Sequence, residues 1–160
     1  MYEDPEVQKQ VLSVIPLKEL EEKAETKAKE NNTAFKDELV KCLLYWYKYD
    51  FFSWCNSPKC SNCQNETKYH ESQGPTPEES KHLASRVEIH KCNSCNQSTR
   101  FPRYNSPAKL SQTKTGRCGE YANLFGCVLR VCGFDVRFID NFEDHVWNEY
   151  WSEALQRVFY

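Results

Sequence analysis

Two pairs of cysteines with the spacing Cys-x-x-Cys are the first residues in this sequence with evident chemistry. Cys60-Ser61-Asn62-Cys63 forms one pair and Cys92-Asn93-Ser94-Cys95 forms the other. Zinc favours four thiolates at tetrahedral corners, and a gap of two residues lets a tight turn present two of them to one ion. The pattern predicts a Zn²⁺ site made by Cys60, Cys63, Cys92 and Cys95. Four protein ligands leave no open position, so this zinc is expected to be structural.

The spacing alone leaves other roles open for these cysteines. They could lie in two unrelated surface turns, or one pair could be a thioredoxin-like redox motif, which should follow a strand and open a helix. Cys55 precedes the first pair and is not needed as a ligand. Three histidines flank the pairs, and we expect them to be surface residues: His70, His82 and His90.

Cys118 differs from the other cysteines because it lies in Gly116-Arg117-Cys118-Gly119-Glu120, at the predicted start of an apolar helix. A helix start offers a positive dipole end and free backbone amides, which favour a thiolate. The following amides could also hold an oxyanion. His145 lies outside the cysteine-pair region and is the candidate base. Such a pair suggests a papain-like or transglutaminase-like thiol enzyme, and the alternative is a buried cysteine and a core histidine.

The pattern of apolar residues predicts the elements that would position these groups. Helices are expected over residues 17–30, 35–52 and 118–132, and strands over 134–139, 145–151 and from 157 onward. Cys42, Cys127 and Cys132 are expected to be packing residues. The fold class is therefore α+β. We expect N-terminal helices in 1–53, a zinc-binding insertion in 54–100 and a catalytic core in 101–160, together forming one compact unit.

Composition excludes several classes of protein. The 160 residues carry a formal charge of −2, which argues against nucleic acid or an anionic membrane as the main partner. No stretch approaches the roughly 20 apolar residues of a membrane span, so no membrane insertion is expected. The acidic start does not look like a signal peptide. Reduced cysteines and a cytosolic or nuclear location are therefore expected.

Six motifs in order resemble the cytoplasmic peptide:N-glycanases, a family with a transglutaminase-like core and an inserted zinc-binding element. The motifs are Phe51-Phe52-Ser53-Trp54-Cys55-Asn56, the two cysteine pairs, Arg100-Phe101-Pro102-Arg103-Tyr104-Asn105, Gly116-Arg117-Cys118-Gly119-Glu120 and Asp144-His145-Val146-Trp147. The resemblance implies that Cys118 is the nucleophile, His145 the base and the four paired cysteines zinc ligands. It also makes Trp54 a candidate for holding the oxyanion, with Glu120 and Trp147 as further oxyanion or substrate candidates.

The implied reaction is hydrolysis of the amide between an asparagine side chain and N-acetylglucosamine, through a thioester on Cys118. The implied substrates are misfolded N-glycosylated proteins returned from the endoplasmic reticulum. The implied partners are the proteasome-shuttle and segregase proteins of that disposal route.

Two positions depart from the family pattern. Tyr121 stands where the family usually has tryptophan. The family's third catalytic residue, an aspartate on the strand after His145, is expected beyond Tyr160, so the chain is expected to be a truncated peptide:N-glycanase of uncertain activity. Two alternatives remain: a catalytically dead, zinc-stabilised adaptor of the same pathway, and a transglutaminase-like enzyme with another amide substrate.

Overall fold

A computed structural model describes residues 2–143 and 145–159. Met1, Asp144 and Tyr160 lie outside the described residues, and with them the aspartate of the Asp-His-Val-Trp motif. The elements in chain order are α1 (Pro5–Leu12), α2 (Leu17–Asn31), α3 (Phe35–Trp46), a π-helical turn η1 (Tyr47–Phe51), β1 (Ser53–Trp54), β2 (Thr67–Gln73), α4 (Pro77–Lys81), β3 (Val87–Cys92), β4 (Ser98–Pro102), α5 (Pro107–Thr113), β5 (Thr115–Gly116), α6 (Cys118–Val131), β6 (Val136–Asn141), β7 (His145–Ser152) and β8 (Arg157–Phe159).

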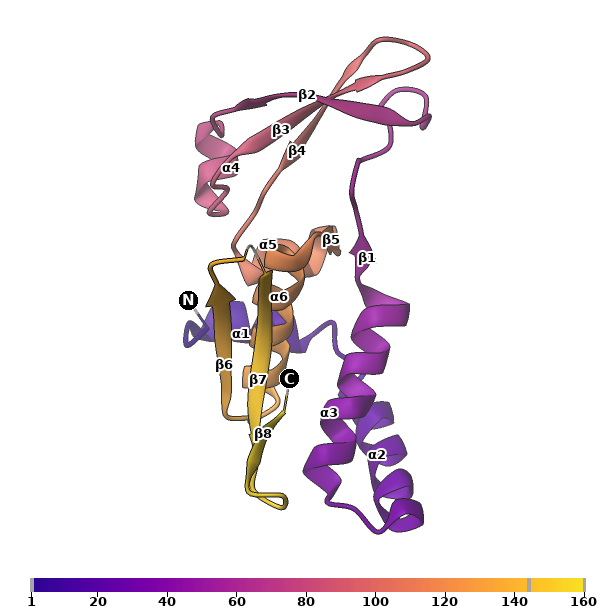
Figure 1. Ribbon diagram of the computed structural model, residues 1–160, viewed down its shortest axis with the longest axis vertical. Helices are drawn as coiled ribbons and strands as arrows, with labels where there is room; N and C mark the ends of the chain where they lie inside the picture. Colours follow the sequence, from indigo (N-terminus) through magenta and orange to yellow (C-terminus); the bar gives the residue numbers. More distant parts are fainter. Residues whose placement is uncertain (1, 144, 160) are drawn as a thin grey trace.

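Helix α6 packs against the antiparallel sheet β6-β7-β8, as Figure 1 shows. The helix ends before Gly133, whose φ of +81° is a left-handed conformation that glycine adopts without strain. Strand β7 is the central strand and pairs with both neighbours. The predicted helix and strands of this region are confirmed, and the predicted α+β class with them.

The N-terminal helices cover the other side of α6. Asp4 caps α1 by accepting from the backbone amide of Glu6, and α2 ends at Asn32, which adopts a left-handed conformation. Helices α2 and α3 pack side by side (Figure 1). The predicted helix over 35–52 is confirmed, although its last turn, η1, widens to a π-helix.

One apolar core joins the N-terminal helices to α6. Tyr47 lies at its centre, fully buried, and its ring packs against those of Phe52, Tyr121 and Phe125. The hydroxyl of Tyr47 donates to the carbonyl oxygen of Tyr121 at 3.1 Å, so this buried hydroxyl has a hydrogen-bond partner. This core fixes the axis of α6, the helix that begins at Cys118.

The paired cysteines belong to a separate antiparallel sheet, β2-β3-β4, at the far end of the molecule from α2 (Figure 1). The sequence predicts a zinc-binding insertion here, and the strands within it are an addition from the structure. Strand β3 is central, pairing with β2 and β4. Within the described residues, no helix has the length and apolar character needed to cross a membrane.

Candidate active site and metal centre

A cavity of about 820 Å³ lies between α3, α6 and the strands β7 and β8. Four of the residues predicted from sequence line it: Trp54, Cys118, His145 and Trp147. These residues come from three separate parts of the chain, and only the folded arrangement brings them to one space. Glu120, the fifth candidate, does not line the cavity.

Cys118 is the first residue of α6, as the sequence predicted. It is partly exposed, and only Arg117 separates it from the short strand β5. Strand β5 pairs in parallel with β1, which places Trp54 opposite Gly116. The backbone amide of Cys55 donates to the Gly116 carbonyl at 2.9 Å and extends this link by one residue. The pairing of two distant segments thus places Trp54 next to the helix start.

His145 is the first residue of β7 and is exposed at the cavity. Its ring stacks on that of Trp147, with centroids 5.6 Å apart and an interplanar angle of 27°. The two side chains share one face of β7 because residues two apart in a strand point the same way. The indole of Trp147 donates to Glu149 at 3.2 Å, and Glu149 pairs with Arg137 at 2.7 Å. The hydrogen bond from Arg137 lowers the pKa of Glu149.

Trp54 lies at the cavity, and 57% of the residue is exposed. Its indole nitrogen donates to the Asn56 side chain at 2.9 Å. The nitrogen therefore already has a partner, which an oxyanion would have to replace.

Glu120 belongs to a buried network of ion pairs and does not line the cavity. Its carboxylate accepts two hydrogen bonds from Arg103, at 2.5 and 2.8 Å, and one from the backbone amide of Arg117 at 2.9 Å. Burial raises the pKa of Glu120, but the bonds from Arg103 and Arg117 outweigh it and lower the pKa overall. Through these three hydrogen bonds the Glu120 carboxylate stabilises the first turn of α6. A direct contact of Glu120 with substrate stays a prediction.

Glu88 of strand β3 is the other carboxylate of this network. Its carboxylate accepts hydrogen bonds from both terminal nitrogens of Arg117, at 3.0 and 2.7 Å, and a third hydrogen bond from Arg103 at 3.0 Å. His90 lies 3.2 Å from the same carboxylate. Burial would raise the pKa of Glu88, but the hydrogen bonds from Arg117, His90 and Arg103 lower it to about 2. The carboxylate is therefore ionised at neutral pH.

His90 corrects one sequence-based expectation. We expected it at the surface, yet only 1% of the residue is exposed. It lies on the central strand β3, where the preceding residues Val87, Glu88 and Ile89 are buried as well. A central strand covered on both faces buries consecutive residues, and the polar ones can be accommodated there because they bond one another.

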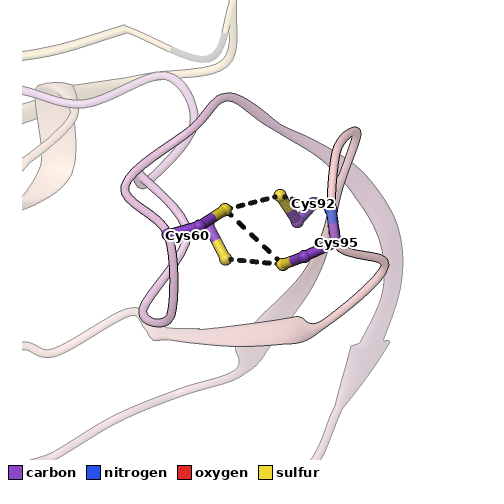
Figure 2. A group of neighbouring side chains, drawn as sticks. Cys60, Cys92 and Cys95 are labelled. Atoms are coloured by element: carbon purple, nitrogen blue, oxygen red, sulfur yellow. Dashed lines mark hydrogen bonds between the residues drawn. The ribbon is translucent and has the colours of Figure 1, made fainter.

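The four paired cysteines converge on one point between the start of β2 and the turn after β3. Their sulfur atoms all lie within 4.8 Å of one another. Cys60 and Cys95 are 3.6 Å apart, Cys63 and Cys92 3.4 Å, and Cys63 and Cys95 3.5 Å. Figure 2 shows the labelled side chains pointing into a common space. Four sulfurs about 2.3 Å from one ion at tetrahedral corners would lie about 3.8 Å apart, so the geometry fits a metal ion.

The turns favour thiolates at two of the four cysteines, whereas the neighbouring sulfurs of Cys92 and Cys95 raise the pKa of Cys63. Backbone amides of Cys95 and Ser94 donate to the Cys92 sulfur, and these bonds lower its pKa to about 6. The amides of Cys63 and Asn62 lower the pKa of Cys60 in the same way. Metal ligation requires the deprotonated thiol, so the backbone prepares at least two ligands.

Comparison with known proteins identifies the family. The sequence model of the transglutaminase-like superfamily matches residues 66–156. The chain belongs to this superfamily. The transglutaminase-like fold that the motifs implied is therefore confirmed, and the matched residues include both the cavity side of α6 and strand β7.

Curated relatives within the transglutaminase-like superfamily carry the name peptide-N(4)-(N-acetyl-beta-glucosaminyl)asparagine amidase. The Saccharomyces cerevisiae protein is 52% identical over 132 residues, which are 80% of this chain and 36% of that protein. The Candida glabrata protein is 44% identical over 98% of this chain and 46% of its own length. The human protein is 41% identical over 98% of this chain and 25% of its own. The resemblance to peptide:N-glycanases is confirmed, and the chain spans between a quarter and a half of these relatives.

The ion network formed by Glu88, Arg103, Arg117 and Glu120 was not predicted from the sequence. Arg103 and Glu120 each lie in a quoted motif, but their pairing joins segments 17 residues apart. The one available signal was the alternation of charged and apolar residues in Val87-Glu88-Ile89-His90, which is unusual for a surface loop.

Proposed function

We propose that this chain carries the thiol amidase centre of a peptide:N-glycanase, which removes N-linked glycans from proteins. One observation carries the proposal: Cys118 at the start of α6 and His145 at the start of β7 line the same cavity. The curated relatives with the name of this amidase support the same conclusion.

The chemistry proceeds in two steps. The Cys118 thiolate attacks the side-chain carbonyl carbon of the glycosylated asparagine, and the C–N bond to the sugar amine breaks as the thioester forms. His145 gives a proton to the departing nitrogen, which leaves as a glycosylamine. Water then hydrolyses the thioester, frees the Cys118 sulfur and leaves aspartate in the peptide. Backbone amides at a helix start lack intrahelical partners, and we expect those of the first turn of α6 to stabilise the oxyanion.

The metal of the cysteine centre is proposed to be zinc with a structural task. A set of four thiolates is the ligand set that structural zinc prefers. The centre would hold the two turns that precede β2 and follow β3.

We further propose misfolded N-glycosylated proteins as substrates, in the cytosol or nucleus, with proteasome-shuttle and segregase proteins as partners. All nine cysteines are free thiols in the structure, which suits a reducing compartment.

The decisive experiment is release of glycan from a denatured N-glycosylated protein, with the Saccharomyces cerevisiae relative as positive control. Release should convert the modified asparagine to aspartate, and in isotopically labelled water one labelled oxygen should enter that aspartate. Cys118→Ala and His145→Ala should each abolish release, whereas Cys132→Ala should not. No release by the folded, zinc-loaded chain, nor by a chain extended beyond Tyr160, would count against the amidase and in favour of an adaptor. Release only by the extended chain would mean that residues beyond Tyr160 complete the site, and release by Cys118→Ala would exclude the thioester.

A further inference from the structure

One arginine side chain links the two chain segments that bring Trp54 and Cys118 to the cavity. Arg117 immediately precedes Cys118, and its guanidinium reaches the two residues that follow Trp54. The Nε atom donates to the Cys55 carbonyl at 3.2 Å, and an Nη atom donates to the Asn56 carbonyl at 2.8 Å. Backbone pairing between β1 and β5 ends at Trp54 and Gly116, so this side chain extends the link beyond the strands.

The guanidinium is itself held by the cysteine-bearing sheet. The Glu88 carboxylate accepts hydrogen bonds from both terminal nitrogens of Arg117, at 3.0 and 2.7 Å. Only 6% of the Glu88 side chain is exposed. Glu88 lies on β3, the strand that ends at Cys92. A continuous path of hydrogen bonds and covalent backbone therefore runs from the metal centre through Glu88 to the residue before Cys118.

We propose that Arg117, fixed by Glu88, is a positioning residue that holds Trp54 beside Cys118 at the cavity. The inference rests on the proposed function, because it assumes that Cys118 is the nucleophile. Arg117 acts through its neighbours and need not touch substrate. The cysteine sheet thereby orients the first turn of α6, in addition to holding its own strands.

The geometry of the guanidinium is the reason for this role. Its planar fork bonds a carboxylate with two nitrogens while the remaining N–H groups reach two carbonyls. A lysine keeps the positive charge beside Cys118 but cannot make these bonds at once. Arg117→Lys therefore separates position from charge. Glu88→Gln weakens the anchor from the side of β3, where the same carboxylate also accepts from Arg103.

Glu79→Gln provides the matched control. Glu79 pairs with Arg100 of β4 at 2.8 Å, so it links α4 to the same sheet. That pair does not reach α6, and its loss removes an ion pair from the cysteine sheet without releasing Arg117.

The test combines two measurements on the three variants and the unaltered chain, each loaded with zinc. Amide hydrogen exchange reports the link directly, because the Cys55 amide bonds the Gly116 carbonyl. In Arg117→Lys and Glu88→Gln we expect this amide to exchange about tenfold faster, with α6 and β7 unchanged. Glycan release should lose about ten- to a hundredfold in kcat with little change in KM, since misplacement by about 1 Å has effects of that size.

Several results would overturn the proposal. Wild-type exchange and kcat in Arg117→Lys would mean that charge alone matters. Faster exchange throughout α6 and β7, with kcat following the folded fraction, would mean a purely structural role. An equal loss in Glu79→Gln would mean that any damage to the sheet suffices. If neither the unaltered chain nor a chain extended beyond Tyr160 releases glycan, the proposed function fails, and the exchange at Cys55 still decides whether Arg117 holds Trp54 beside Cys118.

Discussion

Gly116 and Glu120 approach so closely that no side chain fits between them. A Cβ atom on residue 116 would lie 2.8 Å from Cγ of Glu120 and closer still to its Cβ. The approach exists because the Glu120 carboxylate folds back to accept the Arg117 amide at 2.9 Å. The start of the helix that carries Cys118 is thus built around a glycine and a buried glutamate.

Gly116→Ala is expected to destabilise the fold by about 1–3 kcal/mol, because the added methyl group must displace Glu120 and its bonds to Arg103. Denaturant unfolding measures the change. Gly119→Ala is the control: a Cβ there meets nothing within 4 Å, so stability should stay the same or rise. Equal stability of both variants would contradict the packing described.

Asp37→Ala is expected to cost about 1–3 kcal/mol of unfolding free energy, because two buried hydroxyls lose their acceptor. The carboxylate of Asp37 accepts from Tyr150 and, at 3.0 Å, from Ser152, and so joins α3 to β7. Asp50→Ala, at an exposed position, is the matched control and should change stability little. A similar small effect at Asp37 would show that these bonds contribute nothing net.

Glu88 should make stability depend on pH in the acid range. Its pKa in the fold is about 2, held there against burial by Arg117, His90 and Arg103, with Arg86 3.6 Å away. The unfolded chain should bind this proton near the ordinary value of about 4.3. Between these values the unfolded state binds more protons, so stability rises with pH.

The measurement for Glu88 is unfolding free energy against pH for the unaltered chain and Glu88→Gln. The difference between them should be full above about pH 4.3 and shrink as pH falls toward 2. Glu3→Gln, which alters an exposed carboxylate paired with Arg130, should leave the pH dependence almost unchanged. A constant difference across this range would contradict the depressed pKa.

Removal of metal should unfold the cysteine sheet before the core. We expect one zinc per chain by elemental analysis, and a chelator should release it and raise hydrogen exchange in β2, β3 and β4. Cys92→Ala should prevent binding, whereas Cys55→Ala should bind normally. Full zinc content in Cys92→Ala would contradict a site of four cysteines.

Cys127 and Cys132 should resist alkylation in the folded protein. Burial raises the pKa of Cys127 to about 11 and that of Cys132 to about 12, so few thiolates exist at neutral pH. Between pH 7 and 9 their alkylation by iodoacetamide, followed by peptide mass spectrometry, should be slow and rise about tenfold per pH unit. The same peptides from denatured protein supply the control, and fast labelling in the fold would exclude burial.

The sequence by itself determined the local parts of this protein. The spacing of apolar residues predicted α2, α6 and the strands β6 and β7, because that spacing indicates which face of a helix or strand is buried. The two Cys-x-x-Cys turns predicted the grouping of four sulfurs, because a two-residue gap restricts the chain locally. The motifs around Cys118 and His145 indicated the family.

Only the tertiary structure decided which distant side chains share an environment. Strands β1 and β5 join segments about sixty residues apart in the chain and bring Trp54 to the start of α6. The burial of His90 and the bonds of Arg117 to Glu88, Cys55 and Asn56 follow from packing the cysteine sheet against that start. Such contacts depend on the closure of long loops, and a charged residue in the sequence looks the same whether solvent or another chain segment will surround it.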